Sequence, residues 1–264
     1  HASPATVSRV AVVFVDEAAI GWQASAGALL HRLVSSAQVA WSVEEMLAEL
    51  LERALELVQT DCAPMVALRV ESVAQMLVSL FAAQLGRLDS VEDADEDAVE
   101  RFFVSALVIA VGGVLDAGDR AKFDAFLRND LRPELLPPNE TGTTVFDFAL
   151  TVTARWQPLA QLLPEWQPPS GLTQPELAEA FPAMVVPTPE TVRVEGLLAL
   201  CVEARRSPLL VGGAGTGKTT LALAHAADAG EEDAAWHYFA LCGATSPRTL
   251  QRALERRLER RQGR

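Results

Sequence analysis

A glycine-rich stretch near the end of the printed sequence carries the residue types that bind phosphate. It reads LLVGGAGTGKTT over positions 209–220 and fits the pattern GxxxxGK[ST] through Gly212, Gly217, Lys218 and Thr219. Glycines let successive backbone N–H groups turn toward an anion, and a following helix adds the positive end of its dipole. The lysine of such a loop contacts the β and γ phosphates, and the hydroxyl after it holds Mg²⁺. The stretch therefore predicts binding of ATP or ADP with Mg²⁺.

The residues expected to surround the phosphates are Gly212, Gly213, Ala214, Gly215, Thr216, Gly217, Lys218, Thr219 and Thr220, with Thr219 as the magnesium ligand. Hydrolysis needs in addition a strand that ends in acidic residues, and no such strand follows the loop. The string VVFVDE, which ends at Asp16 and Glu17, lies far before the loop. Either the strand order is permuted or this strand belongs to a different sheet, and we favour the second because permutation is rare. The segment alone is expected to bind nucleotide weakly and not to turn it over.

The residues around the loop predict the elements that position it. A strand is expected at 207–213, a helix at 218–227, a second strand at 235–242 and a second helix that Ser246 caps. This βαβα order is the opening half of a doubly wound parallel sheet. The last helix is rich in arginine, which could form a surface for microtubules or nucleic acid, but a solvated helix face is favoured.

Helices dominate the first half of the sequence. Apolar residues recur at helical spacing between Trp22 and Leu131, which predicts about five helices. The acidic stretch 89–100 is interpreted as a solvated loop that caps the next helix through Asp95 or Asp97. From position 133 the chain is rich in proline and turn formers, and 144–156 alternates like a hairpin. The predicted fold is thus all-α followed by α/β.

Composition limits the classes of function. The chain has 264 residues, half of them hydrophobic, and a net charge of -13, which argues against a nucleic-acid surface. Three widely spaced cysteines predict neither a disulfide framework nor a zinc site and suit a reducing compartment. The longest apolar run, 102–115, is too short to span a bilayer and predicts a buried helix, so no membrane partner is expected. The opening residues lack the features of a secretory signal, and the chain is expected to be part of something longer.

Several motifs occur together in an order that resembles dynein heavy chains. HASPATVSRVAVVFVDEAAIGW at the start is similar to the end of the large subdomain of their second AAA+ module. VGGVLDAGDRAKFDAFLRNDL, GTTVFDFALTVTARWQPL, VVPTPETVRVEGLLAL and PLLVGGAGTGKTT follow in order, as in the passage into the third module. The ending LERRLERRQGR and the string KFDAFLR resemble axonemal heavy chains. The resemblance covers essentially the whole chain.

The resemblance implies a P-loop AAA+ architecture in two parts. Residues 1–131 would be the end of module two, with a last sheet strand at 10–16 and then a helical lid subdomain. Residues 132–264 would be the first half of module three, with an irregular leading segment at 132–206 and the βαβα unit at 207–264. The phosphate loop would then lie near the end because the piece is cut within module three.

The resemblance also implies roles for residues outside the loop. Arg9 would act in trans on the nucleotide of the preceding module as an arginine finger, whereas the alternative is an ion pair at a strand edge. Val186, Pro187 and Thr188 would pack near adenine; without the resemblance they are an extended segment. The parent would be an ATP-driven microtubule motor of cytoplasm, cytoskeleton and ciliary axoneme. Its other AAA+ modules would be partners, and microtubules and the intermediate and light chains would bind parts outside this segment.

Two other functions are consistent with the residues alone. The first is a free-standing P-loop kinase or GTPase with a helical N-terminal domain, which would need a complete catalytic set within the sequence. The second is a non-catalytic helical interaction module whose nucleotide loop is vestigial. Binding of an ATP analogue that depends on Lys218 distinguishes the second from a working nucleotide site.

Overall fold

The computed structural model describes residues 21–88, 95–167, 170–171, 173–176, 181, 184–228 and 236–256. The chain divides into two compact units, His1–His225 and Ala226–Arg264, and each is described by itself below. The predicted strand at 10–16 lies outside the described residues, as do Arg9 and the acidic pair Asp16 and Glu17.

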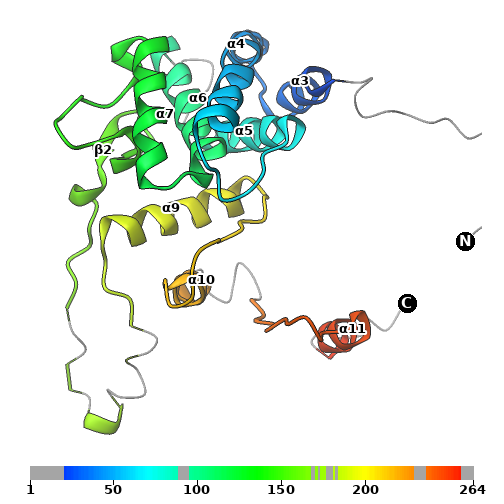
Figure 1. The fold of residues 1–264 in the computed structure, drawn as a ribbon, viewed down its shortest axis with the longest axis vertical. Coiled ribbons are helices and arrows are strands. Elements are labelled where there is room, and N and C mark those ends of the chain that lie inside the picture. The colour runs from blue at the N-terminus through cyan, green and yellow to red at the C-terminus, as the bar shows by residue number, and fades with distance from the viewer. Residues whose placement is uncertain are drawn as a thin grey trace, which may run out of the picture. The chain divides into compact units, whose positions relative to one another are not determined.

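A bundle of helices forms the first part of the first unit, shown from blue to green in Figure 1. The helices are α3 (Trp22–Leu33), α4 (Ala37–Asp61), α5 (Val70–Leu85), α6 (Glu96–Ala110) and α7 (Ala117–Asp130). The prediction of about five helices between Trp22 and Leu131 is therefore confirmed for the described residues of that range.

The helix α4 shows why this sequence folds into a bundle. Its buried side chains are Ala40, Val43, Leu47, Leu50, Leu51, Ala54, Leu55 and Val58. They recur every three or four residues and so form one stripe along the helix. The Ser36 side chain accepts a hydrogen bond from the Val39 N–H at 3.4 Å and caps the first turn. Local sequence thus sets both the start of the helix and its buried face.

The helices α5 and α6 provide the centre of the core. Phe81, Phe102 and Phe103 are among the largest side chains that are completely or almost completely buried. Each such ring contributes roughly 1.5–3 kcal/mol by leaving water. The apolar run at 102–115 is therefore a buried helix and the turn after it, as predicted. Asp95 occupies the N-cap position of α6, but its side chain makes no capping hydrogen bond.

The side chains of Asp119 and Lys122 fasten the end of α4 to α7. Asp119 accepts a hydrogen bond from the Ala63 N–H at 2.7 Å and pairs with Lys122 Nζ at 2.6 Å. Lys122 also donates to the Asp61 carbonyl oxygen at 2.6 Å. The Ala63 N–H, and after it Lys122, hold the pKa of the Asp119 carboxyl below its usual value. The carboxylate form of Asp119 is therefore more favoured in the folded chain than in the unfolded chain.

We expect this carboxylate to make unfolding depend on pH in acid. Its contribution is complete above the unfolded pKa of about 3.9. It is lost as the pH falls through that value and then through the lower folded pKa of Asp119. Urea unfolding measured from about pH 6 down to acid should therefore lose stability less steeply in Asp119→Asn than in the unaltered chain. Equal slopes in the two proteins would contradict this expectation.

A short hairpin follows the bundle. The strands β1 (Phe148–Leu150) and β2 (Trp156–Pro158) are antiparallel, with Ala149 opposite Gln157. This confirms the hairpin predicted from the alternation at 144–156. The short 3-10 helices in this part of the chain are η1 (Gly112–Val114), η2 (Pro133–Leu135), η3 (Val145–Asp147) and η4 (Leu159–Gln161).

The core of the bundle continues past residue 131. The buried side chains Leu135, Leu136, Val145 and Phe146 belong to the same apolar cluster as the helices. The Val145 N–H donates to Asp124 on α7 at 2.7 Å, in a buried hydrogen bond. The segment up to the hairpin thus shares a core with the helices. The boundary at 131/132 stays a prediction.

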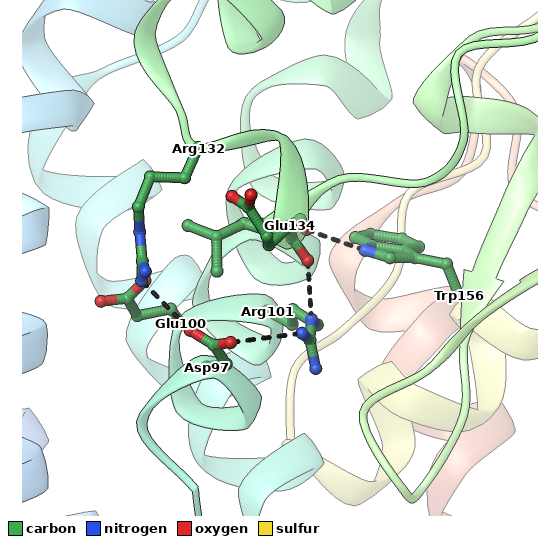
Figure 2. Close-up of polar contacts among 7 residues, drawn as sticks. Asp97, Glu100, Arg101, Arg132, Glu134 and Trp156 are labelled. Carbon is green, nitrogen blue, oxygen red and sulfur yellow. Dashed lines mark hydrogen bonds and ion pairs between the residues drawn. The ribbon is translucent and has the colours of Figure 1, made fainter.

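Polar contacts also hold this segment to α6. In Figure 2, Arg132 lies beside Asp97 and Glu100, and its Nη2 is 3.2 Å from the Asp97 carboxylate. Arg101 donates to the Glu134 carbonyl oxygen at 3.0 Å. Trp156 in β2 donates through its indole N–H to the Leu135 carbonyl oxygen at 2.8 Å. Side-chain donors from α6 and β2 thus satisfy carbonyl groups of η2 that the short turn leaves open.

A helix that the sequence analysis missed occupies part of the irregular leading segment. The helix α9 spans Pro189–Glu203, so the segment 132–206 is irregular only in part. The Thr188 side chain accepts from the Thr191 N–H, and Thr191 completes a capping box. Proline at the first helical position favours this start, because it needs no hydrogen-bond donor there. The pair Thr188 and Pro189 was the signal in the sequence that could have found this helix.

The end of α9 is a tight turn with an unusual residue. The Arg205 N–H donates to the Val202 carbonyl at 3.0 Å, and the Arg206 N–H donates to the Cys201 carbonyl at 2.8 Å. These are the two bonds of a Schellman motif, in which the residue after the cap is left-handed and usually glycine. Here that residue is Arg205, with φ of 53°. The turn therefore places the side chain of Arg205 in a backbone conformation that favours glycine.

We expect Arg205→Gly to stabilise the chain. A side chain in the left-handed region costs about 1–2 kcal/mol, which glycine avoids. Glycine also loses more conformational freedom on folding, which destabilises the folded chain by about 0.5–1 kcal/mol. The net gain should be roughly 0.5–1 kcal/mol in the free energy of unfolding by urea. Arg205→Ala, which keeps the β carbon, is the matched control and should show no gain. A loss of stability in Arg205→Gly would mean that the Arg205 side chain itself supports the turn.

One helix lies entirely within the described residues of the second unit. The helix α11 spans Pro247–Glu255, and the Ser246 side chain accepts from the Thr249 N–H at 3.2 Å. The predicted N-cap and first-position proline are both confirmed. The other helix of the predicted βαβα unit, α10, spans Lys218–Asp228.

The two strands predicted around α10 are not formed in the described residues. Positions 207–213 and 236–242 have no ladder partner there, and the one sheet among the described residues is β1 with β2. Leu209 is 75 % exposed and Tyr238 is 63 % exposed. A strand exists only when a neighbour takes up its N–H and C=O groups, so an apolar run alone does not form one. The helices of the predicted βαβα unit are thus present, but its two strands are not formed in the described residues.

Candidate nucleotide-binding site

The glycine-rich stretch forms a loop that leads directly into α10. Gly215 and Gly217 have φ of 77° and 80°, a conformation that side chains disfavour. The Leu221 N–H donates to the Gly217 carbonyl at 2.9 Å, so the helical bonding starts at the last glycine of the loop. The first N–H groups of a helix have no partner within it. The loop therefore lies at the end of α10 that favours an anion.

Lys218 and Thr216 close this loop on itself. The Lys218 ammonium donates to the Gly213 carbonyl and to Thr216 Oγ1, the latter at 3.0 Å. The Thr216 hydroxyl in turn donates to the Gly213 carbonyl at 3.0 Å. A β carbon added at Gly212 would lie 3.3 Å from Thr216 Oγ1, which is a tight contact. Lys218 therefore lies over the loop rather than pointing away from it.

The remaining residues predicted for the phosphates lie on the same loop and first turn. Ala214 is exposed, as is Thr219 in the first turn of α10, while Thr220 is half-buried. Leu221 is buried and fixes this end of the helix. The structure thus brings the predicted phosphate ligands into one continuous surface.

The residues predicted for the adenine lie before α9. Val186 is exposed, Pro187 is half-buried, and the Thr188 hydroxyl is used to cap the helix. The 15 residues of α9 span about 22 Å between these residues and Arg206. The residues 207–211 would return most of that distance if they were extended, at about 3.3 Å per residue. Whether the two groups meet stays a prediction.

A glycine-rich loop at the start of a helix, preceded by a helical bundle, is the arrangement typical of a P-loop region with a lid. The family described as P-loop containing dynein motor region matches residues 173–264. The family described as dynein heavy chain AAA lid domain matches residues 43–161. The second match begins within α4 and ends with η4, and the first covers α9, the loop, α10 and α11.

Curated relatives agree with both matches. The whole chain is 29 % identical to the dynein gamma chain of the flagellar outer arm of Chlamydomonas reinhardtii. It is 26 % identical to dynein axonemal heavy chain 5 of Rattus norvegicus, again over the whole chain. Over 84 % of the chain it is 30 % identical to human dynein axonemal heavy chain 2.

The chain belongs to the dynein heavy chains, of the axonemal type, and carries AAA+ sequence of their motor region. It spans 6 %, 7 % and 5 % of the length of those three relatives, respectively. Among the residues that the structure describes, no helix has the length and apolar character needed to cross a membrane.

Proposed function

We propose that this chain supplies a nucleotide-binding segment to an ATP-driven microtubule motor. The observation that supports the proposal most is the conformation of the loop at 212–217, with Lys218 held over it at the start of α10. The loop offers backbone N–H groups and a cation to the same anion. A nucleoside triphosphate or diphosphate carries that anion.

The residues present fit a nucleotide and its magnesium ion. Gly215 and Gly217 hold the left-handed backbone that lets a loop curve around phosphate. Lys218 would move from the Gly213 carbonyl to the phosphates, and the Thr219 hydroxyl would take a place at Mg²⁺. The bound nucleotide supplies the free energy of its phosphate bond when it is hydrolysed. Lys218 would orient its phosphates and neutralise part of their charge.

We propose further that the catalytic acids lie outside the described residues. The apolar runs at 207–213 and 236–242 would become strands by pairing with others in a parallel sheet. In P-loop ATPases one of those others ends in the carboxylates that hydrolysis needs. The chain by itself would then bind nucleotide weakly, because the acidic strand that helps to hold Mg²⁺ would not contribute.

The proposal is tested by equilibrium binding to the 264-residue chain. A fluorescent ATP analogue is titrated with Mg²⁺, and unlabelled ATP and ADP are used as competitors. We expect saturable binding that both competitors displace, and no release of inorganic phosphate over a long incubation. Absence of binding would contradict the proposed function. Turnover that Lys218→Ala abolishes would contradict the proposal that this chain by itself does not hydrolyse nucleotide.

Roles that rest on the family resemblance are proposed with it. Arg9 would serve the nucleotide of the preceding module, and Val186, Pro187 and Thr188 would contact adenine. The names of the relatives support a place in the axoneme of a cilium or flagellum. Other AAA+ modules would be the direct neighbours, and microtubules and the intermediate and light chains would bind elsewhere in the parent.

Replacement of Arg9 by alanine in a complete heavy chain should lower its ATPase rate, and an unchanged rate would contradict the role of Arg9.

A further inference from the structure

The last residues of α9 are bound to α5 by a compact set of hydrogen bonds. Arg206 donates through Nε and Nη2 to Ser79 Oγ at 3.0 and 2.8 Å. Arg206 Nη2 also donates to the Gln75 carbonyl oxygen at 3.1 Å, and the Ser79 hydroxyl donates to the same oxygen at 2.8 Å. A guanidinium is suited to such a set because its N–H groups are fixed in one plane. Three groups, separated by 127 and 131 residues in sequence, thus form one network.

Two neighbouring features fix the direction of Arg206. The Schellman turn, with its left-handed Arg205, directs the chain toward α5 just before Arg206. One turn earlier on α9, Glu203 pairs with Arg87 at 2.7 Å, near the end of α5. A left-handed non-glycine residue costs free energy and persists where the surroundings hold it. The network around Arg206 provides that restraint.

Arg206 lies six positions before Gly212, the first glycine of the loop. The residues between them have no ladder partner in the structure, and Leu209 is largely exposed. These contacts anchor the side chain of Arg206 to the helical bundle, and Arg206 is their last residue before the loop. Any displacement of the loop that reaches Arg206 must be transmitted to the Gln75–Ser79 turn of α5.

We infer that Arg206 is a positioning residue which couples the phosphate loop to the lid through Ser79 and Gln75 on α5. The inference rests on the proposed nucleotide binding and extends it to a second location in the fold. When nucleotide fixes the loop, the start of the 207–211 segment is fixed too, and the network on α5 is held more firmly. Coupling of this kind is reciprocal, so loss of the network weakens nucleotide binding.

The test uses the 264-residue chain, the fluorescent ATP analogue with Mg²⁺, four single variants and one double variant. Arg206→Ala should weaken binding about fivefold or more, the lower range of typical coupling between sites. Ser79→Ala should act in the same direction, and combining the two changes should add little, because both remove the same contact. Arg206→Lys should recover part of the affinity, since its ammonium can reach one acceptor but not the full set. Arg53→Ala is the matched control, because Arg53 pairs with Asp130 at another place on the bundle.

Hydrogen exchange separates coupling from a merely structural contact. In the unaltered chain the analogue should slow exchange of the α5 amides around residues 75–79, and in Arg206→Ala this slowing should disappear. Affinity and protection in Arg206→Ala that equal those of Arg53→Ala would overturn the inference while leaving nucleotide binding intact. If the unaltered chain binds no analogue, the proposed function and the inference both fall.

Discussion

Replacing Lys218 with alanine is expected to weaken binding of an ATP analogue by about tenfold to a hundredfold. A hydrogen bond to a charged group is worth roughly 1.5–3 kcal/mol, and each 1.4 kcal/mol is a factor of ten in affinity. The structure holds the Lys218 ammonium on the loop, next to the Gly213 carbonyl, so it reaches a phosphate bound there without crossing the site. The measurement is a fluorescence titration of both proteins at the same Mg²⁺ concentration.

Lys122 provides the matched control for this prediction, because it is the only other lysine in the sequence. It lies on α7, where it pairs with Asp119 and the Asp61 carbonyl. Lys122→Ala should leave the affinity for the analogue within about twofold, well under 1.4 kcal/mol, although it removes an ion pair. Equal affinities of Lys218→Ala and the unaltered chain would favour the vestigial loop. Equal losses in both variants would indicate a general effect of charge.

The phosphate loop and the first helices could be predicted because their signals are local. The spacing of Gly212, Gly217, Lys218 and Thr219 specifies a loop by itself. The stripe of apolar residues on α4 specifies its buried face by periodicity alone. Ser246 and Pro247 specify the start of α11 within four residues. In each case the residues that decide the structure are neighbours in sequence.

Features that join distant residues could not be predicted. The contact of Arg206 with Ser79 bridges 127 residues, and neither residue has a pattern that points to the other. The strands expected at 207–213 and 235–242 depend on neighbouring strands, and an apolar run does not specify which segments those are. The helix α9 is a different case, since Thr188 and Pro189 signalled its start locally. The prolines before it predict irregular structure, but that prediction does not extend past the capping signal at Thr188.

Phe123→Ala is expected to have the largest effect on stability, about 3–5 kcal/mol in the free energy of unfolding. The Phe123 ring on α7 is completely buried, and its centre lies 6.1 Å from that of Phe146 in η3. It also lines the space beside Gly112, where an added β carbon would lie 3.4 Å from the ring and 2.5 Å from that of Phe146. Removing it opens a cavity that neither the glycine turn nor the second ring can fill. Domains are stable by only about 5–15 kcal/mol, so the loss is a large share.

Phe126 on the same helix makes the comparison specific. It is half-buried, and its ring faces Arg53 at 5.8 Å on the outer side of the bundle. Phe126→Ala removes a ring of the same size but leaves no closed cavity, so it should cost less than half as much. Urea unfolding followed by circular dichroism measures both. Equal costs of the two substitutions would contradict the expectation that Phe123 holds η1 and η3 to α7. The continuation of the core past residue 131 would then depend instead on Asp124 and its bond to the Val145 N–H.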